Sequence, residues 1–276
     1  MAPPSADLDE NEPQRSDCIR AITLAQLATS DLGRRPPAAP RTTIPRKIVR
    51  FWHASNDVPD DVNECLRSWD RLRDHGFEFY MFDDHTAADY IQTRYGAQET
   101  AAFSRCRHPA MRSDYFRLCF ILAEGGFYVD ADDVLLSDGW EALFLDDRLK
   151  IQPLCYDIAD QGMLPAAEIW QPDLAVENRI FYVNNDPLVA PAGHPIVRKA
   201  LSRASARLLS GELRPEIQDT TGPGNLTAVL AAHARKLTEA SLPLDFELIR
   251  DWEGIAETRW PLSYRNDARN WRNMDA

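Results

Sequence analysis

The stretch MRSDYFRLCFILAEGGFYVDADDVLL, residues 111–136, decides the fold because a helical pattern, a reversal and a short apolar strand follow one another directly. We expect a helix over residues 109–124 and a tight turn at Gly125-Gly126. An inner strand should follow from residue 127 and end in Asp130-Ala131-Asp132-Asp133. This succession predicts a helix that packs on a sheet, with acidic side chains at the strand's end.

The predicted helix has one narrow polar stripe. At about 100° per residue, this stripe collects Ser113, Asp114, Arg117, Ile121 and Glu124, while most of the remaining circumference is apolar. A helix that is apolar nearly all round is buried, so its polar groups need partners. Two interpretations stay open. Asp114 and Arg117 either form a surface pair that contributes about 0.2–0.5 kcal/mol, or they line a polar cavity and bind sugar hydroxyls and a phosphate.

The acidic group after the strand has the spacing of a divalent-metal site. In an extended segment Asp130 and Asp132 point to the same side and Asp133 points away. Ligands of open α/β sheets gather beyond the carboxyl ends of strands, and two aligned carboxylates bind Mg²⁺ or Mn²⁺ while leaving positions for diphosphate oxygens. An isolated D-x-D more often closes a turn.

Acidic residues at this spacing also occur in two other kinds of site. A calcium loop of the EF-hand type is excluded, because Val134 and Leu135 stand where an oxygen ligand and a glycine belong. An aspartyl-phosphate phosphatase of the haloacid-dehalogenase type, with Asp130 as nucleophile, stays open because that class also places D-x-D after an apolar strand. It does not predict the S-D-x-x-R helix before the glycines.

The rest of the chain alternates strands and helices, which predicts an α/β fold with a mostly parallel sheet. Strands are expected at 47–52, 77–82, 149–154 and 179–183, and helices at 60–75, 86–95 (with more helix to 106), 196–209 and 226–237. We divide the chain into an N-terminal extension, residues 1–43, and a catalytic domain, residues 44–276. The extension is expected to hold a disordered start (1–14), one helix (16–32) and a proline-rich connector (33–43).

Composition narrows the function classes. A formal charge of −12 over 276 residues argues against a nucleic-acid-binding protein, which needs clustered Lys and Arg. The five cysteines are scattered without C-x-x-C spacing, so neither a disulfide framework nor a zinc site is indicated. With no apolar leader and no apolar run long enough for a membrane span, we predict a cytoplasmic protein and leave peripheral membrane contact open.

Four motifs in order, IPRKIVRFWHAS, RSDYFRLCFILAEGGFYVDADDVLL, VNNDPLVAPAGHPIV and TTGPGNLTAVL, resemble the glycosyltransferases with a DXD sugar-binding motif. That group includes initiating mannosyltransferases, capsule-synthesis enzymes and, more distantly, clostridial glucosylating toxins. The resemblance covers about residues 44–230. It implies a GT-A fold, a nucleotide-sugar donor, Mn²⁺ or Mg²⁺, and transfer with retention of anomeric configuration.

The resemblance also assigns roles. Trp52 would stack on the donor base, and Tyr128 would line the donor-sugar pocket with Ser113 and Asp114. Asp130 and Asp132 would serve the metal and the donor, and Arg117 would act with them in catalysis and donor binding. For Trp52 and Tyr128, ordinary core packing remains the competing interpretation.

Three further places carry weaker expectations. Asp83-Asp84 are expected to cap a helix rather than reach a ribose. Asn184, with Asn185 and Asp186, either borders the donor pocket or forms a turn before Pro187. The loop at Gly222 opens a helix whose amides could face the donor phosphates.

The C-terminal part departs from the family pattern, because no histidine follows His233 and Asn270 replaces a serine before Trp271. A third metal ligand would come from Asn270, with Asn266 and Asp267 as further candidates. Together these features predict a metal-dependent retaining hexosyltransferase that uses a UDP- or GDP-sugar and an unknown acceptor. A non-catalytic nucleotide-sugar-binding relative is a second alternative.

Overall fold

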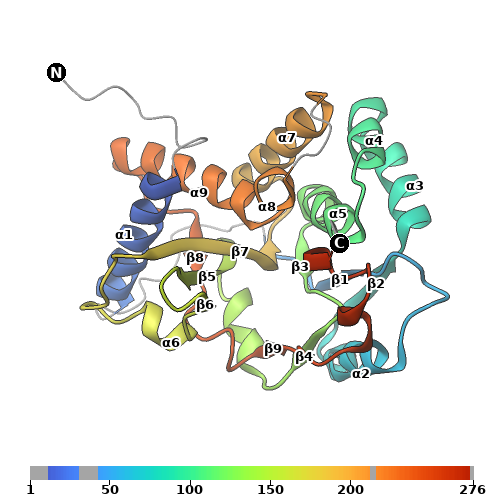
Figure 1. The fold of residues 1–276 in the computed structure, drawn as a ribbon, viewed down its shortest axis with the longest axis horizontal. Helices are drawn as coiled ribbons and strands as arrows, with labels where there is room; N and C mark the ends of the chain where they lie inside the picture. The colour runs from blue at the N-terminus through green and yellow to red at the C-terminus, as the bar shows by residue number, and fades with distance from the viewer. Residues whose placement is uncertain (1–11, 31–42, 212–215, 274–276) are drawn as a thin grey trace.

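A seven-stranded sheet forms the centre of the computed structural model, which describes residues 12–30, 43–211 and 216–273 (Figure 1). Its strands lie in the order β2-β1-β3-β7-β5-β6, and β8 pairs with β5. The strands are β1 (Lys47–Phe51), β2 (Glu78–Phe82), β3 (Gly126–Tyr128), β5 (Leu149–Asp157), β6 (Gly162–Met163), β7 (Arg179–Ala190) and β8 (Phe246–Leu248). A separate two-stranded ladder joins β4 (Asp133–Leu135) to β9 (Ala256–Thr258).

The sheet is mostly parallel in strand direction. β1 pairs in parallel with β2 and β3, and β8 pairs in parallel with β5. β7 is antiparallel to both β3 and β5, and β6 is antiparallel to β5. Five of the seven strands (β1, β2, β3, β5, β8) therefore run one way, which confirms the predicted α/β fold with a mostly parallel sheet.

Helices cover both faces of the sheet because neighbouring residues along its inner strands supply apolar side chains alternately to each face. Val49 and Tyr128 join the core under α5, while Ile48 and Phe127 join the core on the other face around Trp69. The first face carries α3 (Asp84–Arg94), α4 (Ala97–Ser104), α5 (Pro109–Glu124), α7 (Pro195–Leu209) and α9 (Pro223–Glu239). The second face carries α2 (Asp60–Ser68) and the 3₁₀ helices η1 (Asp70–His75) and η2 (Gly139–Phe144).

The turn from α5 into β3 requires glycine. Gly125 and Gly126 have φ of 67° and 122°, a backbone region that side chains disfavour. A Cβ on Gly125 would lie 2.6 Å from the Ala192 nitrogen, and one on Gly126 would lie 2.8 Å from the Lys47 oxygen. The double glycine therefore lets β3 start directly after α5 and run tightly beside β1, as the sequence predicted.

Other element boundaries differ from the prediction. The helix expected over 60–75 is split into α2 and η1, and β7 continues to Ala190 instead of ending at residue 183. Residues 155–178, between the predicted strands at 149–154 and 179–183, contain the end of β5, β6 and α6 (Ala166–Ile169). Ile217–Thr220 forms a single helical turn, α8, before α9.

The N-terminal helix α1 (Glu12–Ser30) packs into the core of the protein. It lies against β7 and α9, and its Ile19 and Ile22 belong to the core cluster under α5 (Figure 1). Buried Arg20 donates to the carbonyl oxygens of Ile169 and Gln171, both at 2.7 Å. Residues 12–14, expected to be disordered, are the first turn of this helix, while residues 1–11 and the connector at 31–42 lie outside the described residues.

The domain boundary between residues 43 and 44 stays a prediction. Within the described part of the chain, no helix has both the length and the apolar character needed to cross a bilayer. All five cysteines are described, and all are unpaired thiols.

Candidate functional site

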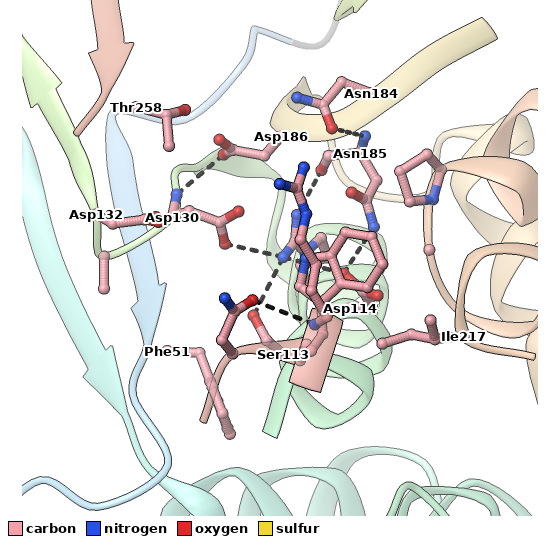
Figure 2. A pocket seen from close by; sticks show the side chains of 18 of the residues that line it. Phe51, Ser113, Asp114, Asp130, Asp132, Asn184, Asn185, Asp186, Ile217 and Thr258 are labelled. Atoms are coloured by element: carbon pink, nitrogen blue, oxygen red, sulfur yellow. Dashed lines mark hydrogen bonds and ion pairs between the residues drawn. The ribbon is translucent and has the colours of Figure 1, made fainter. Parts of the chain in front are cut away.

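A cavity of about 730 Å³ opens at the carboxyl ends of β1 and β3 (Figure 2). Helix α5, the middle of β7, the start of α9 and the C-terminal tail, which we define as residues 259–273, all contribute to its wall. Nearly all side chains selected from the sequence meet here: Trp52, Ser113, Asp114, Arg117, Asp130, Asp132, Asn184, Gly222 and Asn270 line the cavity. Tyr128 lies behind this lining and is fully buried.

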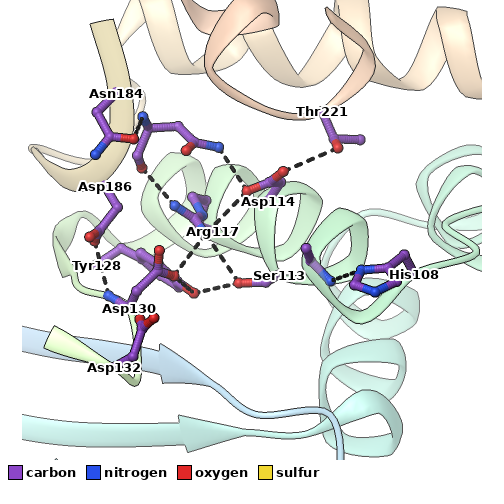
Figure 3. Close-up of polar contacts among 12 residues, drawn as sticks. His108, Ser113, Asp114, Arg117, Tyr128, Asp130, Asp132, Asn184, Asp186 and Thr221 are labelled. Atoms are coloured by element: carbon purple, nitrogen blue, oxygen red, sulfur yellow. Dashed lines mark hydrogen bonds and ion pairs between the residues drawn. The ribbon is translucent and has the colours of Figure 1, made fainter. Parts of the chain in front are cut away.

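Arg117 is the centre of one wall (Figure 3). One terminal nitrogen, Nη2, lies 2.9 Å from Asp130 Oδ1, 3.1 Å from Asp114 Oδ1 and 3.1 Å from Ser113 Oγ. The other, Nη1, donates to the Asn185 carbonyl at 2.9 Å. With 3% of its surface exposed, Arg117 links helix α5, the acids after β3 and strand β7 through buried contacts, so the interpretation as a surface pair is wrong.

Further hydrogen bonds fix the acids around Arg117. The Tyr128 hydroxyl lies 2.6 Å from Ser113 Oγ and donates to Asp130 Oδ1 at 3.1 Å. Asp114 accepts from Asn185 Nδ2 at 2.8 Å and from Thr221 Oγ1 at 3.3 Å. Each carboxylate is thus held by at least two donors, which restricts its rotation and sets its position in the wall.

Residues 130–132 form a turn, which we call the D-A-D turn, rather than the extended segment expected from the sequence. The Asp133 amide closes the turn on the Asp130 carbonyl at 3.3 Å, and the Asp130 amide donates to Asp186 Oδ1 at 2.9 Å. β4 begins at Asp133 and directs the chain toward β9. Asp130 and Asp132 still face the cavity, whereas Asp133 is buried away from its lining.

Asp132 is held by the C-terminal tail. Its Oδ2 accepts from the Tyr264 hydroxyl at 2.7 Å and forms an ion pair with Arg265 Nη2. The Asp132 carbonyl accepts from the Arg259 amide at 2.9 Å. Tyr264 and Arg265 were not selected from the sequence, whereas their neighbours Asn266 and Asp267 were.

The candidate third metal ligand has other partners. Asn270 Nδ2 donates to the Arg265 carbonyl at 2.8 Å, and its Oδ1 accepts from the Arg272 amide at 3.2 Å. Asn266 and Asp267 do not line the cavity, and Asp267 pairs with Arg269 at 2.7 Å. The structure therefore uses these side chains to fold the tail. Asn270 lines the cavity, but both its amide nitrogen and its amide oxygen form hydrogen bonds within the tail.

Burial and mutual repulsion shift the acids of the cavity floor toward their protonated forms. Burial raises the pKa of Asp114 to about 6, with Arg117 opposing the shift. Burial and the neighbouring Asp132 charge raise the pKa of Asp133 to about 7. The pKa of Asp132 is raised by burial and by Asp130, and that of Asp186 is raised well above its ordinary value by burial and the charges of Asp133 and Asp130.

The donor set of the D-A-D turn fits Mg²⁺ or Mn²⁺. Within the described residues, no group of three or more His, Cys, Asp or Glu side chains is arranged to hold a metal ion. Mg²⁺ in phosphate-transfer sites is commonly bound by one or two carboxylates together with substrate phosphates, so two aspartates meet that requirement. Both aspartates already have a cationic partner, Asp130 in Arg117 and Asp132 in Arg265, and Asp130 keeps 34% of its side chain exposed.

The remaining selected residues have mixed surroundings. Trp52 is buried beside the cavity, donates from Nε1 to the Asp57 carbonyl at 3.1 Å and meets the Tyr264 ring edge-to-face at 5.2 Å. Asn184 donates to Gln152 Oε1 at 3.3 Å from within β7, so the turn expected before Pro187 is wrong. Gly222 is the N-cap of α9, as the helix-opening loop predicted.

Two residues named in the sequence analysis, Asp83 and Glu124, lie outside the cavity. Asp83 is the N-cap of α3, with a capping box to Thr86, which confirms the capping prediction. At the far end of the polar stripe, Glu124 pairs with Lys47 at 3.0 Å and Arg94 at 2.9 Å and does not line the cavity.

Comparisons with known proteins agree with the motifs. Residues 59–149 match the family described as "glycosyltransferase sugar-binding region containing DXD motif". The chain is 20% identical over 212 residues to the initiation-specific alpha-1,6-mannosyltransferase of Saccharomyces cerevisiae, an alignment that covers 66% of this chain and 43% of the yeast protein. It therefore spans less than half the length of that relative.

Among solved structures, the PaToxG glycosyltransferase superposes with a TM-score of 0.48 at 15% identity, covering 94% of each chain. The family match includes helix α5 and the D-A-D turn, which belong to the longest of the four motifs, whereas the other three motifs lie outside residues 59–149. Residues 59–149 are therefore similar to the DXD-containing sugar-binding region of glycosyltransferases.

Proposed function

We propose that this protein transfers a hexose from a UDP- or GDP-sugar to an acceptor, with retention of anomeric configuration and with Mn²⁺ or Mg²⁺ as cofactor. The observation that carries this proposal is the linked set of buried Ser113, Asp114 and Arg117 with half-buried Asp130, which closes one wall of the cavity at the D-A-D turn. These groups combine fixed carboxylate acceptors for sugar hydroxyls with a guanidinium for a negatively charged leaving group.

Within this proposal, the place of each residue in the cavity wall determines its role. Arg117 holds Asp130 and Asp114 at fixed places, so the donor sugar meets an already organised wall. The Asp114 carboxylate has two neutral hydrogen-bond donors besides Arg117, and it accepts from a sugar hydroxyl where the cavity reaches it. Trp52 borders the base, and Asn184 and Gly222 border the sugar and phosphates on the opposite wall.

The cofactor would be held by Asp130 and Asp132 and would supply Lewis-acid stabilisation of the departing nucleoside diphosphate. Arg117 pairs with one of these two carboxylates, Asp130, so positive charge from the protein already adjoins the place where negative charge develops. Retention rests on the family resemblance. We assign no covalent nucleophile.

The proposal is tested by incubating the purified protein with UDP- and GDP-hexoses, with and without Mn²⁺, and measuring release of nucleoside diphosphate. We expect release from one class of donor, dependent on Mn²⁺, and abolished in Asp132→Asn without loss of the folded state. Asp138→Asn is the matched control, because Asp138 is an aspartate with 71% of its side chain exposed outside the cavity.

Release that is unchanged in Asp132→Asn would contradict the metal assignment. Binding of a nucleoside diphosphate with Mn²⁺ but no release from any nucleotide-sugar would indicate the non-catalytic nucleotide-sugar-binding relative, and the proposed transfer would be wrong. Trapping of Asp130 by a phosphate analogue would instead indicate the aspartyl-phosphate alternative.

A further inference from the structure

We propose that Arg265 is a built-in counter-ion of Asp132 that competes with the divalent cation for the Asp132 carboxylate, so that metal binding releases the Arg265 guanidinium into the donor cavity. This inference rests on the proposed function only in taking Asp132 as a ligand of the metal. It assigns a role to a tail residue that the DXD motif itself does not contain.

The geometry places the two charges in direct contact inside the protein. Arg265 Nη2 pairs with Asp132 Oδ2, and each side chain has 12% of its surface exposed. Asp132 is the acidic partner that the described residues provide for Arg265. Because both charges are largely removed from water, neither is well compensated without the other, and a second cation at Asp132 must replace the first or share its carboxylate.

Arg265 is also placed so that it can move without unfolding its surroundings. Its guanidinium carbon lies 4.3 Å from the Trp260 ring centroid and 5.0 Å from that of Tyr264. Its backbone carbonyl, not its side chain, anchors the tail by accepting from Asn270 Nδ2. The Arg265 Nε has no hydrogen-bond partner among the described residues, so the guanidinium holds a donor in reserve.

The charge balance of the cavity favours an exchange of cations. Four aspartates gather at the D-A-D turn: Asp130, Asp132 and Asp186 line the cavity, the Asp130 amide donates to Asp186 Oδ1 at 2.9 Å, and Asp133 is buried. Arg117 is committed to Asp130 and Asp114. A divalent ion neutralises more of this charge than one guanidinium does, and a released guanidinium has the planar fork that suits a diphosphate.

The first test measures Mn²⁺ affinity of the whole protein without nucleotide, by electron paramagnetic resonance of the free ion. Arg265→Met removes the charge and keeps an apolar stem over Trp260, so we expect Mn²⁺ to bind at least about tenfold more tightly than in the wild type. Arg272→Met is the matched control. Arg272 also lies over Trp260, at 4.5 Å, and lines the cavity. Within the described residues, however, it forms no ion pair with Asp132. We expect its affinity within about twofold of the wild type, since water screens this exposed charge.

Equal Mn²⁺ affinity in Arg265→Met and the wild type, with both proteins folded by circular dichroism, would overturn the proposal. If Arg265→Met does not fold, the tryptophan emission of the wild type tests the proposal instead. Mg²⁺ should change tryptophan emission as the guanidinium leaves the Trp260 face, and this change should be absent from Trp260→Phe. A wild-type emission that Mg²⁺ leaves unaltered would refute the exchange.

Neither readout involves sugar transfer, so the two proposals fail separately. If Arg265→Met binds Mn²⁺ more tightly but the wild type cleaves no nucleotide-sugar, the exchange of cations is supported and the proposed transfer is wrong. If the wild type cleaves a nucleotide-sugar in a Mn²⁺-dependent way but Arg265→Met binds Mn²⁺ no more tightly, the proposed transfer is supported and the exchange of cations is wrong.

Discussion

The two aspartates of the D-A-D turn are held by arginines of different structural origin. Asp130 pairs with Arg117, which projects from the middle of the buried 16-residue helix α5. Asp132 pairs with Arg265, which lies in η3 (Ser263–Asn266), one of two short 3₁₀ helices in the C-terminal tail. The first arginine has 3% of its side chain exposed and the second 12%.

This difference separates a fixed half of the site from an adjustable half. Arg117 contacts two carboxylates, a hydroxyl and a carbonyl, and its guanidinium carbon lies 4.2 Å from the Tyr128 ring centroid. Arg265 contacts one carboxylate and two aromatic rings. A rigid wall can pre-organise the donor sugar, while a less constrained arginine can change partners when charge enters the cavity.

Replacing each arginine by methionine should reveal the largest difference between the halves. Arg117→Met leaves Asp114 and Asp130 without their buried counter-ion and should lower the free energy of unfolding by about 3–5 kcal/mol. Arg265→Met should cost about 1–2 kcal/mol, since one charged hydrogen bond is lost and Tyr264 still donates to Asp132. Urea unfolding followed by circular dichroism measures both.

Arg259→Met is the control for removal of an arginine, because Arg259 forms an exposed pair with Glu64 at 3.1 Å, and its loss should cost less than about 1 kcal/mol. Equal losses in Arg117→Met and Arg265→Met would show that the two halves do not differ in rigidity.

The fixed half was predictable from the sequence because its contacts are local. The helix bounds at Pro109 and Glu124 were predicted as they stand, and Ser113, Asp114 and Arg117 share a face at intervals that any α-helix fixes. The double glycine brings Asp130 back toward that face within a few residues. Helical periodicity and turn chemistry therefore specify most of this wall.

The adjustable half was not predictable, because its contacts join residues far apart without a periodic pattern. Arg265 reaches Asp132 across 133 positions from a four-residue 3₁₀ helix. The β4–β9 ladder that brings the tail to the D-A-D turn has three residues in each strand. In β7, the polar run Asn184-Asn185-Asp186 before a proline predicts a turn, but pairing of the flanking residues with β3 and β5 keeps the run within one strand, where the register shifts between Ile151 and Pro153.

A second prediction uses the buried acid of the fixed half. Asp114 has an ordinary pKa of 3.8, and burial raises it to about 6 in the folded protein. An acid with a raised folded-state pKa stabilises the fold when protonated and loses that contribution as pH rises through the folded-state pKa. Ionising Asp114 between pH 4 and 7 should therefore cost on the order of 3 kcal/mol, at about 1.4 kcal/mol per pKa unit.

The difference in unfolding free energy between the wild type and Asp114→Asn isolates this effect from the other titrating groups. We expect the wild type to lose stability relative to Asp114→Asn as pH rises from about 4 to 7, with the change centred between the two pKa values. A difference that is flat across this range would mean that Arg117 keeps Asp114 ionised with an ordinary pKa. The fixed half would then be an ion-paired wall at every pH tested.

The smallest effect comes from removing one hydroxyl in each half. Tyr128→Phe deletes a fully buried hydroxyl that serves both Ser113 and Asp130, and Tyr264→Phe deletes one that serves Asp132 alone. At about 1 kcal/mol per buried hydrogen bond, we expect losses of about 2 kcal/mol for Tyr128→Phe and about 1 kcal/mol for Tyr264→Phe in urea unfolding. Tyr95→Phe, whose hydroxyl donates to the Cys119 carbonyl outside the cavity, is the reference for one lost bond. A larger loss in Tyr264→Phe than in Tyr128→Phe would place the tighter constraint on Asp132, and the C-terminal tail would then be the fixed half of the site.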